Sequence, residues 1–443
     1  MKETKIKGSS QMGISQKKSS SLKVFASSIR MSKVKSAYAG FGVIWAINIS
    51  TIFRSSWAGD DWPISQTPYW IQWRYGALTN WNIWTEAMFW NDQWMRGAGR
   101  FYPLTWIESR FAFSYLLELW QYKLYQVGML FIAGLLLVVI CYLFSRSHTF
   151  SIFALASLSL TVQFRRDFDP HLAFAVMLPS LLFKIFLAVI FAYLAGRTSK
   201  KTKGAFLGFI SGILFFAGMS TYEFGFLLFP LLVFSFLIGT ISTVSEYEKI
   251  KKKELYFGWL LSIKFLPIVI SWVGYGLFVF GYLRPRASSI SGSYVLGLSW
   301  SSLKVFFSQV IMGLPLVSLR NGDLSFSPLT IIVGLLLLLL CRFSFSRLFA
   351  GQIGRGESKE VQGKDFAAKT QNSYFVLLFA LTMILSPGFM MAMQPTWWNR
   401  ADLQHTYLGV MITEFGTAII VAYIFERIVA SNIKFMSIKK SRT

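Results

Sequence analysis

The chain has 443 residues, of which 54% are hydrophobic and only 14% are charged. This composition excludes an ordinary soluble domain, in which about a quarter of the residues are charged. The formal net charge of +24 does not indicate a nucleic-acid partner, because most Lys and Arg residues lie in short tracts between apolar segments, where they set membrane topology.

The apolar segments predict an all-α, polytopic transmembrane helical bundle of about ten spans, since a helix needs roughly 20 residues to cross the hydrocarbon core. The shorter apolar segment 305–319 contains Pro315. We expect it to be re-entrant or interfacial, because counting it as a crossing would place the basic tract 342–372 outside. The predicted spans are 38–53, 123–144, 149–163, 172–196, 204–220, 224–244, 255–283, 328–341, 373–393 and 408–428.

The positive charges predict the orientation and the domain boundaries. Residues 1–37 are rich in Lys and Ser and are expected to form a disordered basic cytoplasmic tail. A transmembrane domain over 38–430 follows, with a cytoplasmic linker at 342–372, and residues 431–443 form a second basic tail. Both termini are therefore expected to be cytoplasmic, in a multi-pass protein of the cytoplasmic (inner) membrane.

The first predicted outer loop, 54–122, is the longest extramembrane segment and is rich in tryptophan. Ile83, Ala87, Trp90 and Trp94 share one helical face, which predicts an amphipathic interfacial helix lying flat on the membrane. The aromatic residues indicate either a belt at the lipid headgroups or rings that stack on sugars or flank an isoprenoid chain. The tryptophans are Trp57, Trp62, Trp70, Trp73, Trp81, Trp84, Trp90, Trp94, Trp106 and Trp120.

Two polar motifs delimit this loop. Gly59-Asp60-Asp61-Trp62 follows the first span, and Gly99-Arg100-Phe101-Tyr102-Pro103 precedes the second. An acidic pair at the membrane face can supply a general base, and Asp60 and Asp61 are the candidate catalytic residues. Arg100 is a candidate contact for an anion such as a phosphate. The pattern does not decide which of the two acids is the base.

A second acidic pair, Asp167 and Asp169, lies in the next predicted outer loop. With Asp61 these side chains could form an oxygen-rich site for Mg or Mn. The alternative is a solvated loop in which Asp167 pairs with a neighbouring arginine and Asp169 caps the following helix. The sequence leaves both open.

Three further polar positions face the same predicted side. Glu223 follows Ser220-Thr221-Tyr222 between two apolar spans and could, with Trp62, line a wet cavity. Arg400 and His405 in the last outer loop are candidate contacts for a donor phosphate. Arg284 and Arg286 are weaker candidates, because nothing in the sequence around them converges.

Absent motifs narrow the chemistry. The chain has no Walker loop, no GxSxG element and no Cys/His cluster with zinc-ligand spacing. Two classes of function therefore remain open. One is an enzyme that takes an activated substrate from the bilayer, and the other is a carrier that performs no chemistry.

The acidic pair after the first span, the Arg-Phe-x-Pro element before the second, the acids of the next outer loop and the count of about ten helices together resemble the GT-C superfamily of integral membrane glycosyltransferases. The similarity is greatest to bacterial members that modify surface glycans. It implies that the first-loop acid of the family falls on Asp60 or Asp61, and its second-loop acids on Asp167 and Asp169. The Trp-Trp-Asp-Tyr-Gly signature of the oligosaccharyltransferase branch is absent.

The resemblance implies transfer of a sugar from a polyprenyl-phosphate donor to a cell-surface glycan or lipid acceptor on the outer face of the membrane. A first-loop aspartate would act as general base, and Arg100 or Arg400, or a metal, would stabilise the departing phosphate. The alternatives are a surface polysaccharide polymerase or ligase, and a lipid or solute transporter. The sequence shows no internal repeat of the kind that transporters often have.

Overall fold

The computed structural model describes residues 34–57, 61–162, 177–243, 262–287, 297–314, 362–395, 398 and 409–440. Within these ranges the regular structure is helical and no strand occurs, which confirms the predicted all-α class. Contacts divide the chain into two units, one of Met1–Val43 with Phe326–Gly356 and one of Ile44–Ser325 with Glu357–Thr443. The described part of the first unit is the start of a single helix, and the packing described below lies within the second unit.

Seven helices in the described part of the chain are long and apolar enough to cross a membrane, so the protein is a multi-pass membrane protein. Each has at least 18 residues, close to the roughly 20 that the hydrocarbon core requires. They are Val34–Arg54, Leu119–Ser145, Met177–Arg197, Lys201–Thr221, Phe224–Ile241, Leu266–Arg286 and Tyr374–Ala392.

These helices coincide with seven of the predicted spans. The segment predicted at 149–163 forms α7 (His148–Thr161), whose 14 residues are fewer than a full crossing needs. The segment 408–428 falls within α18 (Val410–Lys440), a helix of 31 residues that is not among the seven. The span predicted at 328–341 lies outside the described residues, so the total of ten stays a prediction.

The apolar segment 305–319 lies partly in α14 (Trp300–Met312). The 13 residues of this helix are too few to cross a membrane. It packs against α17 (Gln362–Ala392). Its re-entrant or interfacial position stays a prediction, because the segment continues beyond the described residues.

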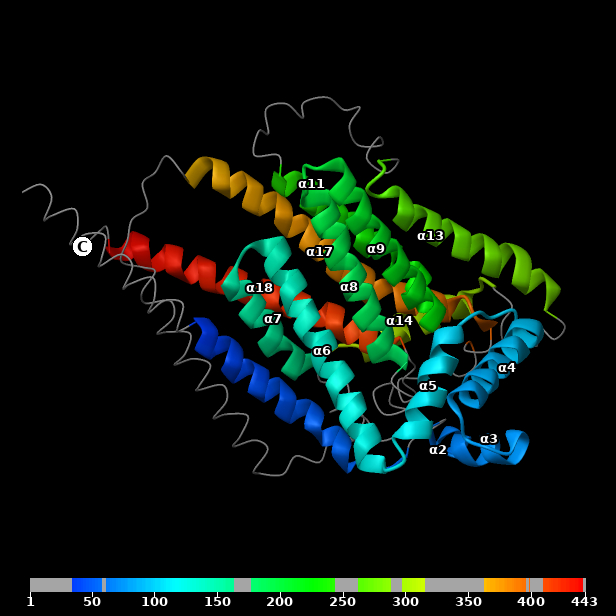
Figure 1. The fold of residues 1–443 in the computed structure, drawn as a ribbon. Helices are drawn as coiled ribbons and strands as arrows, with labels where there is room; N and C mark the ends of the chain where they lie inside the picture. Colours follow the sequence, from blue (N-terminus) through cyan, green and yellow to red (C-terminus); the bar gives the residue numbers. More distant parts are fainter. Residues whose placement is uncertain are drawn as a thin grey trace, which may run out of the picture. The chain divides into compact units, whose positions relative to one another are not determined.

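The remaining apolar helices of the second unit pack side by side (Figure 1). Their bounds are α6 Leu119–Ser145, α8 Met177–Arg197, α9 Lys201–Thr221, α10 Phe224–Leu227, α11 Phe229–Thr243, α13 Leu266–Gly276, η3 Leu277–Leu283 and η4 Arg284–Arg286. The helix α8 contacts α6, α9 and α11, whereas α18 contacts α7 and α17. Because α8 is apolar around most of its circumference, most of its side chains are buried.

Glycines set the close approach of α9 to α13. Gly204, Gly208 and Gly212 recur every fourth residue and therefore share one face of α9. A Cβ atom on Gly212 would lie 2.8 Å from the carbonyl oxygen of Pro267. Small residues at this spacing allow two membrane helices to pack closely. This packing holds the N-terminal half of α13 against α9.

Four helices between the first span and α6 form a group that we call the cap: α2 (Asp61–Ser65), α3 (Thr67–Tyr75), α4 (Asn80–Ala98) and α5 (Pro103–Tyr115). They pack against one another, and α5 also packs against α9 (Figure 1). The long first loop is therefore a folded helical layer next to the membrane helices.

Local sequence signals explain the ends of the cap helices. The Thr79 side chain accepts a hydrogen bond from the backbone N–H of Asn82 and caps α4. Gly99 ends the same helix at φ 64°, a left-handed conformation that glycine adopts without strain. Pro103 then begins α5, where its missing N–H costs nothing.

The apolar face of α4 differs from the expectation. Ile83 and Ala87 are buried, and the ring of Trp90 stacks on Trp106 of α5 with centroids 5.8 Å apart. This face therefore packs inside the cap instead of lying on the membrane, because α5 supplies an aromatic partner for it. The exposed aromatic residues of the cap lie elsewhere, at Trp62, Tyr69, Trp70, Trp73, Trp81, Trp84, Phe89 and Tyr115.

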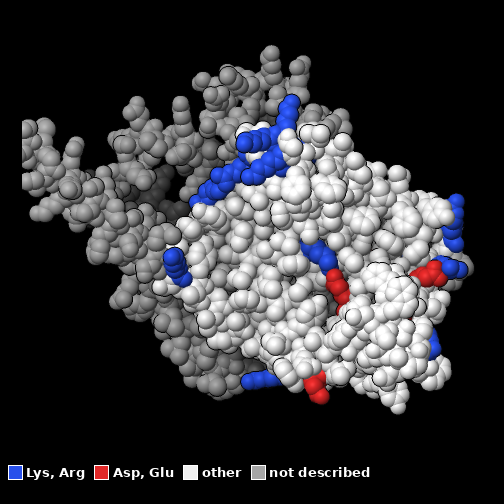
Figure 2. Space-filling view, in the orientation of Figure 1, with Lys and Arg blue, Asp and Glu red and all other residues white. Residues whose placement is uncertain are grey.

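Charged side chains are sparse on the surface of the helical bundle. Figure 2 shows a face on which broad areas carry neither basic nor acidic residues, and the charges gather at a few places. Many large apolar side chains are exposed on the membrane-length helices, including Leu135, Phe206, Phe209 and Ile270. Such a surface is stable in lipid, where apolar side chains have no need to be buried in protein.

Candidate functional site

A buried carboxylate, Glu223, lies in the turn between α9 and α10. Its side chain is only 2% exposed. An ionised carboxylate at such a position is stable only if cations and hydrogen bonds replace its water. Two arginines from distant parts of the chain supply them.

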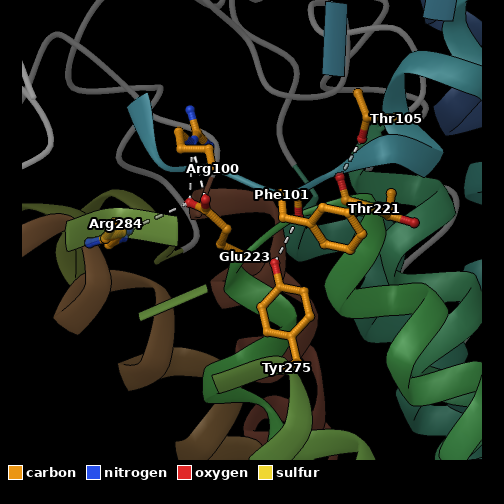
Figure 3. Close-up of polar contacts among 7 residues, drawn as sticks. All are labelled: Arg100, Phe101, Thr105, Thr221, Glu223, Tyr275 and Arg284. Carbon is orange, nitrogen blue, oxygen red and sulfur yellow. Dashed lines mark hydrogen bonds and ion pairs between the residues drawn. The ribbon is translucent and has the colours of Figure 1, made fainter. Parts of the chain in front are cut away.

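Arg100 and Arg284 both approach Glu223 (Figure 3). The Nε atom of Arg100 donates to Oε1 at 3.2 Å and to Oε2 at 3.1 Å. Nη2 of Arg284 lies 4.0 Å from Oε2. The arginine side chains are 10% and 12% exposed. Two buried cations thus share one carboxylate, so this cluster carries excess positive charge.

Arg284 is incompletely paired. Its Nε and Nη1 atoms are buried, and no group in the described part of the chain accepts a hydrogen bond from them. Its guanidinium carbon lies 4.8 Å from the ring centroid of Phe280. Arg100, in contrast, contacts Glu223 and lies over the rings of Tyr102 and Tyr222 at 4.6 and 5.4 Å.

The segment that carries Arg100 is held in place by backbone contacts. The hydroxyl of Tyr275 in α13 donates to the carbonyl oxygen of Phe101 at 2.9 Å. Thr105 donates its hydroxyl to the carbonyl oxygen of Thr221. A Cβ atom on Gly99 would lie 2.7 Å from the Cα atom of Arg284. The Gly-Arg-Phe-Tyr-Pro motif therefore joins the cap to the ends of α9 and α13 through hydrogen bonds and a close backbone contact.

A second buried charged group lies at the junction of the cap and α6. Asp61 begins α2 and is fully buried. Its Oδ2 atom accepts a hydrogen bond from the hydroxyl of Tyr122 at 2.9 Å and a longer one from Nε2 of Gln126 at 3.5 Å. The rings of Trp57 and Phe113 pack against Tyr122, with centroids 5.1 and 4.6 Å away. The first-loop acid is thus fixed in orientation against a membrane helix.

Lys123 is buried in the same region. It is the residue after Tyr122 and is fully buried in the second turn of α6. Its Nζ atom has no hydrogen-bond partner among the described residues. The negative charge of Asp61 acts on this ammonium group. Each charge therefore lowers the cost of burying the other.

We expect a non-additive effect of removing these two charges. Asp61→Asn leaves the Lys123 ammonium without its counter-charge, and Lys123→Met leaves the carboxylate without its own. In the double variant both charges are gone. Its loss of stability should therefore be smaller than the sum of the two single losses, by about 1–3 kcal/mol. Thermal unfolding of all four proteins in one detergent gives this coupling energy. Additive effects would show that the two charges do not interact.

A second set of charged groups pairs within the cap. Glu86 is 3% exposed and accepts hydrogen bonds from Arg74, Tyr75 and Trp90 at 2.8, 3.2 and 2.8 Å. Burial, with the adjacent Glu86 charge, raises the pKa of Tyr75. Burial lowers the pKa of Arg110 to about 10, so its guanidinium stays charged at neutral pH. These residues stabilise the cap and offer no free base.

Lys184 pairs within the bundle. Its Nζ atom contacts the carboxylate of Glu108 in α5, which also accepts a hydrogen bond from Ser180. This pair attaches the cap to α8. Lys184 is therefore paired within the protein, although it lies inside a membrane-length helix.

The predicted site residues fall into two groups. Asp61, Arg100 and Glu223 are buried and paired as described above, whereas Trp62 is 62% exposed, since α2 turns Asp61 inward and its neighbour outward. The remaining predicted residues, Asp60, Asp167, Asp169, Arg400 and His405, lie outside the described residues. The predicted Mg or Mn site therefore stays a prediction, and the described residues hold no group of three metal-ligating side chains.

Sequence reasoning missed the role of Lys123 and ranked Arg284 below the other phosphate candidates. Arg284 has no charged neighbour of opposite sign in the sequence, and its partner Glu223 lies 61 positions away. Lys123 stands at the start of an apolar span, where a lysine commonly indicates only the membrane boundary. A rule that flags any ionisable residue within reach of a span end would have found both.

The fold and these charged clusters define a multi-pass, all-α membrane protein with a helical cap whose acidic and basic residues are buried at the ends of membrane helices. No family model, no curated protein and no solved structure matches the chain. Its function is therefore inferred from the site and from the sequence motifs.

Proposed function

We propose that the protein is a membrane glycosyltransferase that moves a sugar from a polyprenyl-phosphate donor to a glycan or lipid acceptor, with the cap on the outer face of the cytoplasmic membrane. One observation supports this most: both first-loop motifs place a charged residue in a buried position against membrane helices. Asp61 contacts α6, and Arg100 contacts Glu223 at the end of α9. A cap with this arrangement suits a substrate whose reactive part lies at the membrane surface.

The proposed reaction uses the acidic pair and the arginine cluster in separate roles. A carboxylate of Asp60 or Asp61 accepts the proton of the acceptor hydroxyl, and the hydroxyl oxygen attacks the anomeric carbon. The bond from that carbon to the phosphate oxygen breaks. The polyprenyl phosphate leaves and keeps the bonding electron pair on that oxygen. Buried guanidinium groups stabilise the charge that develops on the phosphate. Direct displacement inverts the anomeric centre.

The lipid-linked donor explains why such an enzyme is embedded in the membrane. A polyprenyl carrier diffuses laterally in the bilayer, so its phosphate arrives at the depth of the helix ends. Nucleotide sugars are not available on the outer face. A transporter would be expected to place its charged residues near the middle of the membrane, whereas Arg284 and Glu223 lie at the ends of their helices.

The test is a transfer assay with the purified full chain in nanodiscs. Polyprenyl-phosphate sugars and nucleotide sugars are offered in parallel with a set of glycan and lipid acceptors, with the labelled sugar followed into product. We expect transfer from a lipid-linked donor only, with inversion at the anomeric carbon. Transfer from nucleotide sugars, or retention of configuration, would contradict the proposal.

A further inference from the structure

The cation at the Glu223 cluster that is available to a ligand is Arg284 and not Arg100. Arg100 donates to both carboxylate oxygens of Glu223 and is covered by two aromatic rings. Arg284 is 4.0 Å from the same carboxylate through Nη2 alone. Its Nε and Nη1 atoms are buried, with no acceptor in the described part of the chain. Glu223 therefore largely neutralises Arg100 and leaves the charge of Arg284 in excess.

A buried guanidinium with two unused donors is costly unless something accepts its hydrogen bonds. A guanidinium N–H donates a strong, charge-assisted hydrogen bond to an oxyanion, and arginine is a preferred partner of phosphate. Because the cluster as a whole is positive, an anion is favoured over a neutral hydroxyl ligand. The chemical class that fits is a phosphate.

The position of Arg284 identifies the source of that phosphate. The membrane-length helix Leu266–Arg286 ends two residues later, so the guanidinium lies at the depth where lipid phosphates lie. Immediately before it, the helix changes to π geometry over Leu277–Leu283, a distortion that is frequent at functional sites. Leu277 and Tyr282 on this segment are exposed and offer an apolar surface beside the charge.

We propose that Arg284 binds the phosphate of a polyprenyl-phosphate lipid through a guanidinium N–H that the described residues leave unused, and that Glu223 and Arg100 position it. This inference rests on the proposed function for the sugar that the lipid carries. The binding of the phosphate itself can be tested without any sugar transfer.

The experiment compares Arg284→Gln with Arg286→Gln in the full chain. Arg286 lies in the same short helix, is exposed, and donates to the carbonyl oxygen of Tyr282, which makes it a matched control. Undecaprenyl phosphate, undecaprenol, inorganic phosphate and phosphatidylglycerol are titrated separately, and the thermal midpoint is followed. A ligand that binds only the folded state raises this midpoint by an amount that grows with its concentration relative to Kd.

We expect undecaprenyl phosphate to stabilise the wild type and Arg286→Gln, while undecaprenol does not. In Arg284→Gln the apparent Kd should rise about 10- to 100-fold, the range for lost charge-assisted hydrogen bonds. Its midpoint without ligand should not fall, because Glu223 keeps Arg100 as its partner. A lower unliganded midpoint with unchanged affinity would make Arg284 a structural residue and overturn the inference.

The remaining outcomes distinguish the source of the phosphate, the sugar transfer and the role of Arg284 from one another. An equal response to inorganic phosphate, or to phosphatidylglycerol, would overturn the assignment to a polyprenyl carrier. Binding that depends on Arg284 in a protein that transfers no sugar would keep this inference and reject the glycosyltransferase. Transfer that is unchanged in Arg284→Gln would keep the enzyme and reject this role for the arginine.

Discussion

Replacing the first-loop acid that acts as base should lower sugar transfer by about 10²–10⁴-fold, the usual contribution of general base catalysis. Asp60→Asn and Asp61→Asn are compared in the transfer assay at saturating donor and acceptor. An asparagine has nearly the shape of aspartate but cannot accept the proton of the acceptor hydroxyl. The loss should appear in kcat, because the base acts in the chemical step.

The matched control for this prediction is Asp92→Asn. Asp92 lies in the same loop, but it is exposed and pairs with Arg96 one turn along α4. Its loss should leave transfer unchanged, since exposed pairs of this kind contribute only about 0.3–0.5 kcal/mol to stability.

Asp61→Asn needs a second control, because the charge of Asp61 also acts on Lys123. The amide oxygen that this substitution introduces can still accept the hydrogen bond from Tyr122, but the counter-charge is gone. Adding Lys123→Met removes the uncompensated ammonium group and should restore stability without restoring transfer. If the double variant recovers transfer, Asp61 is a structural residue. If neither single asparagine variant loses transfer while it stays folded, the base assignment is wrong.

Composition and hydrophobic runs predicted the membrane class and the position of seven helices, because a membrane span is a local property of about 20 residues. The same local signal could not predict how the cap folds. The face of Ile83 and Ala87 had the spacing of a membrane-surface helix, but Trp106 provides a protein partner for it. Which surface an apolar face meets depends on residues distant in the chain.

The sequence identified individual residues of the candidate site, but it could not predict which of them contact one another. Asp61, Arg100 and Glu223 stand out in the sequence because each lies in a short polar motif between apolar segments. That Arg100 pairs with a carboxylate 123 positions away follows only from the packing of α5 against α9. The sequence suggested Arg100 for the phosphate, and the structure directs attention to Arg284, since the charge of Arg100 is already matched.

Removing the carboxylate that the two arginines share should destabilise the protein strongly. In Glu223→Gln, Arg100 and Arg284 lose the carboxylate that they share, and breaking a buried charge pair in this way costs about 3–5 kcal/mol. Thermal unfolding in detergent measures the loss. Adding Arg284→Gln to Glu223→Gln should recover part of it, because the repulsion between the two guanidinium groups then disappears. A double variant less stable than Glu223→Gln would contradict this account of the cluster.

The same variant also separates structure from binding. In the wild type Glu223 offers Arg284 a competing carboxylate, whereas in Glu223→Gln that carboxylate is gone and an incoming phosphate can take its place beside the two arginines. Undecaprenyl phosphate should therefore raise the thermal midpoint of Glu223→Gln more than that of the wild type, even though the unliganded variant is less stable. A smaller shift would mean that Glu223 contributes to ligand binding by orienting Arg284, and that its negative charge is needed in the bound state.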